Sequence, residues 1–362
     1  MPVKKRRLFY VHGFDPRGAA HYTSLFRGQA QKQLAAESVN YQLEASDPID
    51  GQFDIRFTEN GQTTETRYQY LDWTGVVKEY LGISLFGFLK ETLQSARWYW
   101  REEFRKPCKK IAPTTYMAFW LGYLGVFIPA LVMLLTLLLG ALQLIDWPVV
   151  AVVAVLVVLG YGYLIKRFNL TWLVRSFNLN YDIGEHPEKF MPYIRKMADE
   201  VEAALVNDDS DEVLIVCHCF GTSMVNMLLA ELANRGRLQR PLSVLTLAQV
   251  CPALVWTTPW YQQCVKDSQK LQLTHLDFSS PADGMCIPFY QLYSDADHVV
   301  SEARTPRFHK MFSDRKYRRI ISKNKLRVHF QYLLASDNPV YFDFFRITAG
   351  PNSLLEVIQD KK

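Results

Sequence analysis

Hydrophobic and polar residues alternate along this chain with the spacings of strands and helices. Residues 7–14, RLFYVHGF, predict a short buried strand that ends at His-Gly. Residues 21–38 and 187–208 have the spacing of amphipathic helices. Residues 53–73 predict a β-hairpin, because Asn-Gly lies between two β-prone runs.

The second half of the chain continues this alternation. Residues 212–218 predict a strand, and residues 220–236 predict a helix that ends near a glycine. Two more strands are expected at 241–250 and 271–280. Strands that alternate with helices indicate an α/β fold, in which helices flank a mostly parallel sheet.

Two apolar runs interrupt this pattern. Residues 117–145 and 149–165 contain no charged side chain, and each is long enough to cross about 30 Å of hydrocarbon as a helix. Lys, Arg, Trp and Tyr are frequent in the flanks, at 97–110 and 166–175, whereas the connecting turn carries only an Asp. The positive-inside rule therefore predicts a transmembrane hairpin with both flanks in the cytoplasm. We expect an integral protein of the bacterial inner membrane.

This hairpin sets the expected domain organisation. Residues 1–75 and 168–362 lie on the same side of the membrane and are expected to form one globular domain. Residues 113–167 form the inserted hairpin. Residues 76–112 are apolar and aromatic with scattered charges. They are compatible either with a segment lying flat on the membrane or with an ordinary amphipathic cap helix.

The charge distribution is consistent with a membrane surface. The chain has 362 residues and a formal net charge of +5, with basic clusters at 4–7, 101–110, 166–175 and 315–327. Acidic residues separate these clusters, which favours an anionic membrane surface over nucleic acid as the partner. The oligomeric state is left open.

The six cysteines are expected to be reduced thiols. The N-terminus carries basic residues without a long apolar run behind them, so no secretory signal is expected. No cysteine or histidine cluster has the spacing of a zinc site, and we expect no metal and no cofactor.

The segment Cys217-His218-Cys219-Phe220-Gly221 stands between a predicted strand and a predicted helix. This layout resembles the nucleophile elbow, G-x-S-x-G, of the α/β-hydrolase superfamily, the lipase and esterase type, with Cys219 in place of serine. The early His-Gly resembles the oxyanion-hole turn of that superfamily. The order of Cys219, Asp283 and His329 along the chain matches its order of nucleophile, acid and histidine.

The resemblance implies a role for each residue. Cys219 would attack an acyl carbonyl, His329 would move its proton, and Asp283 would orient the imidazole. The backbone N–H groups of Phe14 and Phe220 would hold the oxyanion.

Several residues compete for the acid and base roles. Asp277, Asp295 and Asp297 are alternative acids, and His298 and His309 are alternative histidines.

The resemblance also implies a reaction, with a thioester acyl-enzyme as its intermediate. We expect hydrolysis of an amphiphilic, lipid-like ester or thioester at the bilayer. Transfer of the acyl group to an acceptor other than water is a close competitor. A non-catalytic membrane scaffold on a degenerate hydrolase fold is the third interpretation.

Overall fold

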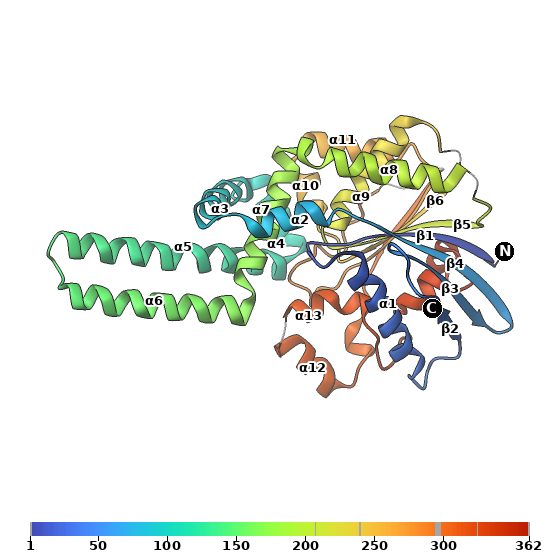
Figure 1. The fold of residues 1–362 in the computed structure, drawn as a ribbon, viewed down its shortest axis with the longest axis horizontal. Coiled ribbons are helices and arrows are strands. Elements are labelled where there is room, and N and C mark those ends of the chain that lie inside the picture. Colours follow the sequence, from blue (N-terminus) through green and yellow to red (C-terminus); the bar gives the residue numbers. More distant parts are fainter. Residues whose placement is uncertain (1, 207, 239, 294–297, 324, 361–362) are drawn as a thin grey trace.

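One twisted sheet runs through the molecule (Figure 1). The computed structural model describes residues 2–206, 208–238, 240–293, 298–323 and 325–360. Within these residues the sheet has eight strands in the order β2-β3-β4-β1-β5-β6-β7-β8. All pairings from β4 to β8 are parallel, whereas β2–β3 and β3–β4 are antiparallel. The expected α/β class and mostly parallel sheet are confirmed. The strands are β1 (Lys5–Val11), β2 (Gln42–Ala45), β3 (Gln52–Glu59), β4 (Gln62–Leu71), β5 (Glu212–His218), β6 (Leu242–Leu247), β7 (Leu273–Phe278) and β8 (Val299–Arg304).

The expected hairpin is formed by β3 and β4. Its turn residues, Asn60 and Gly61, have φ angles of 50° and 77°, the left-handed conformation that a two-residue hairpin turn requires. The sequence pattern missed β2 and β8, which lie at the two edges of the sheet. Edge strands carry polar and charged residues and therefore lack the apolar alternation of central strands.

Helices cover both faces of the sheet. Because successive strand residues point to opposite faces, β1 contributes Leu8 and Tyr10 to one buried cluster and Phe9 and Val11 to the other. The first cluster includes residues of α1 (Gly18–Leu34), α14 (Phe344–Ala349) and α15 (Leu354–Gln359). The second includes residues of α2 (Thr74–Gly82), α7 (Leu170–Glu185), α8 (Met191–Val206), α9 (Gly221–Arg235), α10 (Pro252–Thr257) and α11 (Pro259–Ser268).

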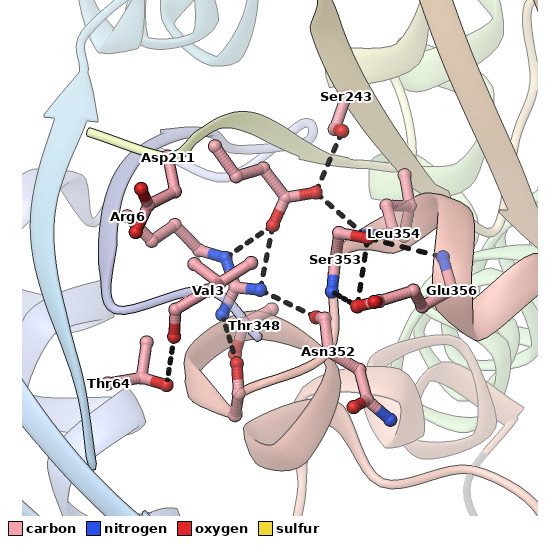
Figure 2. A network of polar contacts seen from close by, with 12 residues as sticks. Val3, Arg6, Thr64, Asp211, Ser243, Thr348, Asn352, Ser353, Leu354 and Glu356 are labelled. Atoms are coloured by element: carbon pink, nitrogen blue, oxygen red, sulfur yellow. Dashed lines mark hydrogen bonds and ion pairs between the residues drawn. The ribbon is translucent and has the colours of Figure 1, made fainter. Parts of the chain in front are cut away.

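A buried ion pair connects the start of the sheet to the end of the chain. The Arg6 Nε donates to Glu212 Oε2 at 2.7 Å, and the same guanidinium donates to the carbonyl oxygens of Gly350 and Asn352, both at 2.8 Å. Figure 2 shows this network, in which the side chain of Ser353 caps α15. The network satisfies a fully buried arginine and holds the C-terminal helices against the N-terminal ends of β1 and β5.

Two long helices extend away from this body: α5 (Pro113–Ala141) and α6 (Trp147–Phe168) (Figure 1). They are long and apolar enough to cross a membrane, with mean hydropathies of 2.5 and 2.4. Most of their large apolar side chains are exposed, including Leu121, Leu134 and Val155. We refer to α5 and α6 as the helix pair.

The segment between β4 and the helix pair is helical and packs on the body. It contains α2, α3 (Leu85–Tyr99) and α4 (Glu102–Ile111). On α3, Phe88, Trp98 and Tyr99 are buried, whereas Leu85 and Phe86 on the outer face are 72% and 80% exposed. The inner face fits a cap helix, and the exposed apolar face leaves contact with a membrane as a prediction.

Candidate active site

The segment that contains Cys219 is a sharp turn between β5 and α9. Cys219 has a φ of 57°, in the left-handed region that a non-glycine residue rarely adopts. Its backbone N–H donates to the carbonyl of Leu247, at the end of the adjacent β6, at 2.9 Å. This turn places the Cys219 side chain between the end of β5 and the N-terminus of α9, at the cost of a strained backbone.

Two glycines let the backbone approach this turn closely. A Cβ atom on Gly221 would lie 2.6 Å from the carbonyl oxygens of both Val11 and His12, at the end of β1. A Cβ atom on Gly13 would lie 2.7 Å from the Cys219 Cβ and 3.4 Å from its Sγ. Only glycine fits at either position without displacing backbone. The end of β1 and the Cys219 turn are therefore in direct contact.

Asp283 and His329 form a buried pair near this turn. Asp283 lies in the loop after β7, and His329 lies on α13 (Lys325–Phe330). The His329 Nδ1 and Asp283 Oδ2 are 2.9 Å apart, and both side chains are fully shielded from solvent. The backbone N–H of Met285 and the hydroxyl of Tyr332 also donate to the Asp283 carboxylate, at 2.9 and 3.3 Å. Asp283 can therefore orient the His329 ring.

The competing residues that the structure describes lie elsewhere. The Asp277 Oδ1, on β7, accepts a hydrogen bond from the Thr246 hydroxyl at 2.7 Å. Burial raises the Asp277 pKa to about 7, although hydrogen bonds from Thr246 and neighbouring side chains oppose this. The exposed His298 contacts the carbonyl of Gln269. His309 lies beside Tyr317 in a separate surface segment.

Two further competing acids, Asp295 and Asp297, lie outside the described residues.

The protonation of His329 depends on burial and on two neighbouring side chains, those of Asp283 and Cys219. Burial alone would lower its pKa, but Asp283 and then Cys219 outweigh burial and raise the His329 pKa to about 10. Burial opposes ionisation of Asp283, yet His329 holds the pKa of that carboxyl below its ordinary value. An imidazolium beside the Asp283 carboxylate is therefore the favoured state of His329 near neutral pH.

The second ring nitrogen of His329 is available for a ligand. Its Nε2 atom is buried and forms no hydrogen bond with any described residue. Cys219 is near enough to raise the pKa of His329, but a well-aligned hydrogen bond between them is not formed. Such contacts are often loose in unliganded enzymes and tighten when a substrate binds.

The backbone N–H of Phe220 directly follows Cys219 in the chain, and that of Phe14 follows Gly13, which packs against the Cys219 side chain. Neither donates a hydrogen bond to another described residue. Their rings lie 6.3 Å apart in an edge-on arrangement, which brings the loop after β1 and the start of α9 together. Unpaired N–H groups in a buried setting favour an anionic oxygen as their ligand.

His218 and Tyr332 support the site, and neither was expected from the sequence to have a catalytic role. The His218 Nε2 lies 2.8 Å from the backbone carbonyl of His329, so this nitrogen carries the proton. Burial lowers the His218 pKa to about 3 and keeps the ring neutral. Tyr332 follows His329 by three residues, a helical spacing that could have suggested a shared face.

Trp172 covers the site and was also missed. Its indole Nε1 donates to the backbone carbonyl of Phe14 at 3.1 Å. Its ring lies 5.9 Å from the Phe14 ring and 6.4 Å from the His329 ring. Cys219 is only 1% exposed and His329 is fully buried. In this structure the candidate site is therefore closed to solvent. No local sequence signal marks Trp172, because it lies more than 40 residues from Cys219 in the chain.

The base of the helix pair frames the same residues. At the start of α5, the Thr115 hydroxyl donates to the carbonyl of Cys286, in the loop that carries Asp283. A Cβ atom on Gly284 of that loop would lie 3.4 Å from the Ala118 Cβ. At the other end, α6 finishes at Phe168 and α7, which carries Trp172, begins two residues later. Any movement of the helix pair would therefore reach both sides of the site.

No group of three or more metal-ligating side chains occurs among the described residues. Comparisons of this chain with protein-family models, curated proteins and solved structures find no match.

Proposed function

We propose that this chain is a membrane-anchored acyl-transfer enzyme of the α/β-hydrolase type. In this proposal it hydrolyses an ester or thioester of an amphiphilic substrate through Cys219, His329 and Asp283. The observation that supports it best is the buried Asp283–His329 pair beside a cysteine held at positive φ. A cysteine that merely fills a core needs neither a strained backbone nor a paired imidazole.

The chemistry follows from these positions. The Cys219 sulfur forms a bond to the acyl carbon, and the carbonyl electron pair moves to oxygen, where the Phe14 and Phe220 N–H groups stabilise the negative charge. The tetrahedral intermediate collapses as the bond to the leaving alcohol or thiol breaks. The leaving group takes a proton from the His329 Nε2, and a thioester on Cys219 remains.

Water completes the cycle. His329 removes a proton from water, the hydroxyl adds to the thioester carbon, and the thiolate leaves and regains its ion pair with the imidazolium. Asp283 fixes the ring so that Nε2 faces the reacting atoms throughout.

Transfer to another acceptor has an observation in its favour. The site is closed, with Trp172 over it and Cys219 1% exposed. A thioester shielded from water survives until an amine, alcohol or thiol enters. The same residues serve this reaction, with the acceptor in place of water.

The helix pair would anchor this site in the bilayer. In the proposal α5 and α6 cross the membrane, with their connecting turn outside and the sheet domain in the cytoplasm, because Lys and Arg flank the pair on the domain side only. So many exposed apolar side chains on two adjacent helices need a non-aqueous surrounding. Since the base of the pair contacts the Asp283 loop, an acyl chain leaving the bilayer would reach Cys219 by a short path.

Mass spectrometry of the full-length protein tests the chemistry. After incubation with a long-chain acyl thioester, we expect an acyl adduct on Cys219 and release of the free acid. The adduct should be absent from Cys219→Ala and retained in Cys251→Ala, a matched control in which another buried cysteine next to a helix N-terminus is removed. Equal turnover by the wild type and Cys219→Ala would leave a non-catalytic scaffold as the interpretation.

Alkaline extraction tests the anchor. Membranes washed at high pH should retain the full-length protein, and a cysteine introduced at Asp146, in the turn between α5 and α6, should react only with a reagent added outside the cell. Release of the protein into the wash would refute the two spans.

A further inference from the structure

A short basic helix lies at the base of the helix pair. This helix, α12 (Asp314–Lys323), turns Ile320 into the core and Tyr317 partly toward it. Arg315, Arg318 and Arg319 are exposed on the opposite side, at the i, i+3, i+4 spacing of one helix face. We call these three residues the arginine face.

None of the three arginines forms an ion pair with a described residue, although Asp314 stands at the start of the same helix. Lys316, on the same helix, pairs with Asp337. Like charges on one helix face destabilise it unless an anion lies against them. The three guanidinium groups are therefore exposed and can bind an anion from outside the molecule.

The position of α12 indicates where that charge comes from. The Arg167 guanidinium, at the end of α6, donates to the backbone carbonyl of Ser322 on α12 at 3.3 Å. Figure 1 shows α12 and α13 next to the base of the helix pair. If the pair crosses a bilayer, the arginine face and the end of α6 lie at the depth of the lipid headgroups.

We propose that the arginine face docks on the anionic phosphate headgroups of the cytoplasmic leaflet. Guanidinium groups bind phosphate oxygens through paired N–H donors, which suits a surface of many phosphates. The inference rests on the membrane-spanning part of the proposed function and not on its catalytic part.

Docking would also stabilise the candidate active site. The described part of α13 begins two residues after α12 ends and carries His329. A fixed α12 restrains the segment that presents this imidazole to Cys219, so anionic lipid would favour the catalytic arrangement. Neutral lipid would leave α12 held by its core contacts, the Lys316–Asp337 pair and the hydrogen bond from Arg167.

Hydrogen exchange on the full-length protein in vesicles measures the docking. Backbone amides of residues 314–323 should exchange more slowly in vesicles of mixed phosphatidylcholine and phosphatidylglycerol than in phosphatidylcholine alone. The difference should vanish near 1 M salt, because the screening length falls from about 10 Å to about 3 Å. The triple variant Arg315→Gln, Arg318→Gln, Arg319→Gln should weaken docking by roughly 100-fold, because each basic residue contributes about fivefold, and it should lose the slowing.

A charge-matched variant controls for net charge. Lys4→Gln, Lys32→Gln and Arg67→Gln removes three exposed positive charges from other parts of the molecule, and it should keep the slowing. Soluble glycerol phosphate added to neutral vesicles should not reproduce it, since docking needs a surface of phosphates.

Three results would overturn the inference. These are equal exchange of α12 in both kinds of vesicle, a triple variant that behaves as the wild type, and full slowing by soluble glycerol phosphate or by an oligonucleotide in neutral vesicles. If the protein is instead released by alkaline extraction, the membrane-spanning proposal fails first, so the two failures are distinguishable.

Discussion

Replacing Asp283 by Asn should make the reactivity of Cys219 depend steeply on pH. In the wild type, the pKa of His329 is raised from its ordinary 6.5 to about 10, first by Asp283 and then by Cys219, against the opposing effect of burial. That rise corresponds to roughly 5 kcal/mol in favour of the imidazolium. The proton therefore stays on His329 across neutral pH, which keeps a cationic ring beside the Cys219 sulfur.

The amide removes the larger of the two charges that stabilise the imidazolium. Burial then lowers the pKa of His329, so the ring becomes neutral at pH 7 and the Cys219 sulfur loses its cationic neighbour. We expect the alkylation rate of Cys219 to be nearly constant between pH 6 and 9 in the wild type. In Asp283→Asn we expect it to be lower at pH 7 and to rise with pH. Acyl turnover should fall by roughly 10³- to 10⁴-fold, the scale known for loss of the acid in such triads.

Asp277→Asn is the matched control, because it makes the same change at a fully buried carboxyl that does not contact His329. Iodoacetamide labelling followed by peptide mass spectrometry gives the rate at each cysteine separately. The reasoning is refuted if Asp283→Asn keeps the flat wild-type profile. It is equally refuted if Asp277→Asn, rather than Asp283→Asn, produces the steep one.

Three other changes follow from the contacts above. Trp172→Ala removes the hydrogen bond and the indole ring that cover the site. Alkylation of Cys219 should then accelerate on the order of tenfold, which corresponds to losing about 1.4 kcal/mol of stabilisation of the closed site. An unchanged rate would mean that Trp172 does not limit access to Cys219. Gly221→Ala brings a Cβ within 2.6 Å of two backbone carbonyl oxygens at the end of β1. It should lower the free energy of unfolding by roughly 1–3 kcal/mol in urea titration, whereas Gly28→Ala, where no atom lies within 4 Å, should not destabilise the protein. Glu212→Gln leaves the buried Arg6 guanidinium without its carboxylate and should lower the free energy of unfolding by roughly 3–5 kcal/mol in the same titration. Its control, Glu65→Gln at an exposed pair, should lower it by about 1 kcal/mol or less.

Much of the fold could be predicted because its signals are local. The Asn60-Gly61 turn, the buried strand before Cys219 and the glycine after α9 each depend on residues within one element. The edge strands β2 and β8 were missed because they bury little apolar surface. The segment around His329 gave no decisive periodicity, and the structure shows that it is helical.

The sequence predicted which types of residue form the candidate site, but not how these residues are arranged in space. The motif around Cys219 and the late Asp283 and His329 could be identified by residue type and order, but other acids and histidines competed for the same roles. Choosing among them needs the distance between side chains that lie 46 residues apart, and that distance depends on how β7 and α13 meet. The same holds for Trp172, whose contact with the site arises from packing at the base of the helix pair.

The sequence by itself determined what short-range physics controls: an α/β alternation, two apolar helices of membrane-spanning length, and a strand–turn–helix with Cys219 at its apex. Hydrophobic spacing and turn chemistry act over a few residues, so they can be read directly from the chain. Only the tertiary structure decided that Asp283 pairs with His329, that Gly13 and Gly221 bring β1 against the Cys219 turn, and that Trp172 closes the site. These contacts join segments far apart in the chain, and long-range packing, which local pattern does not encode, selects among them.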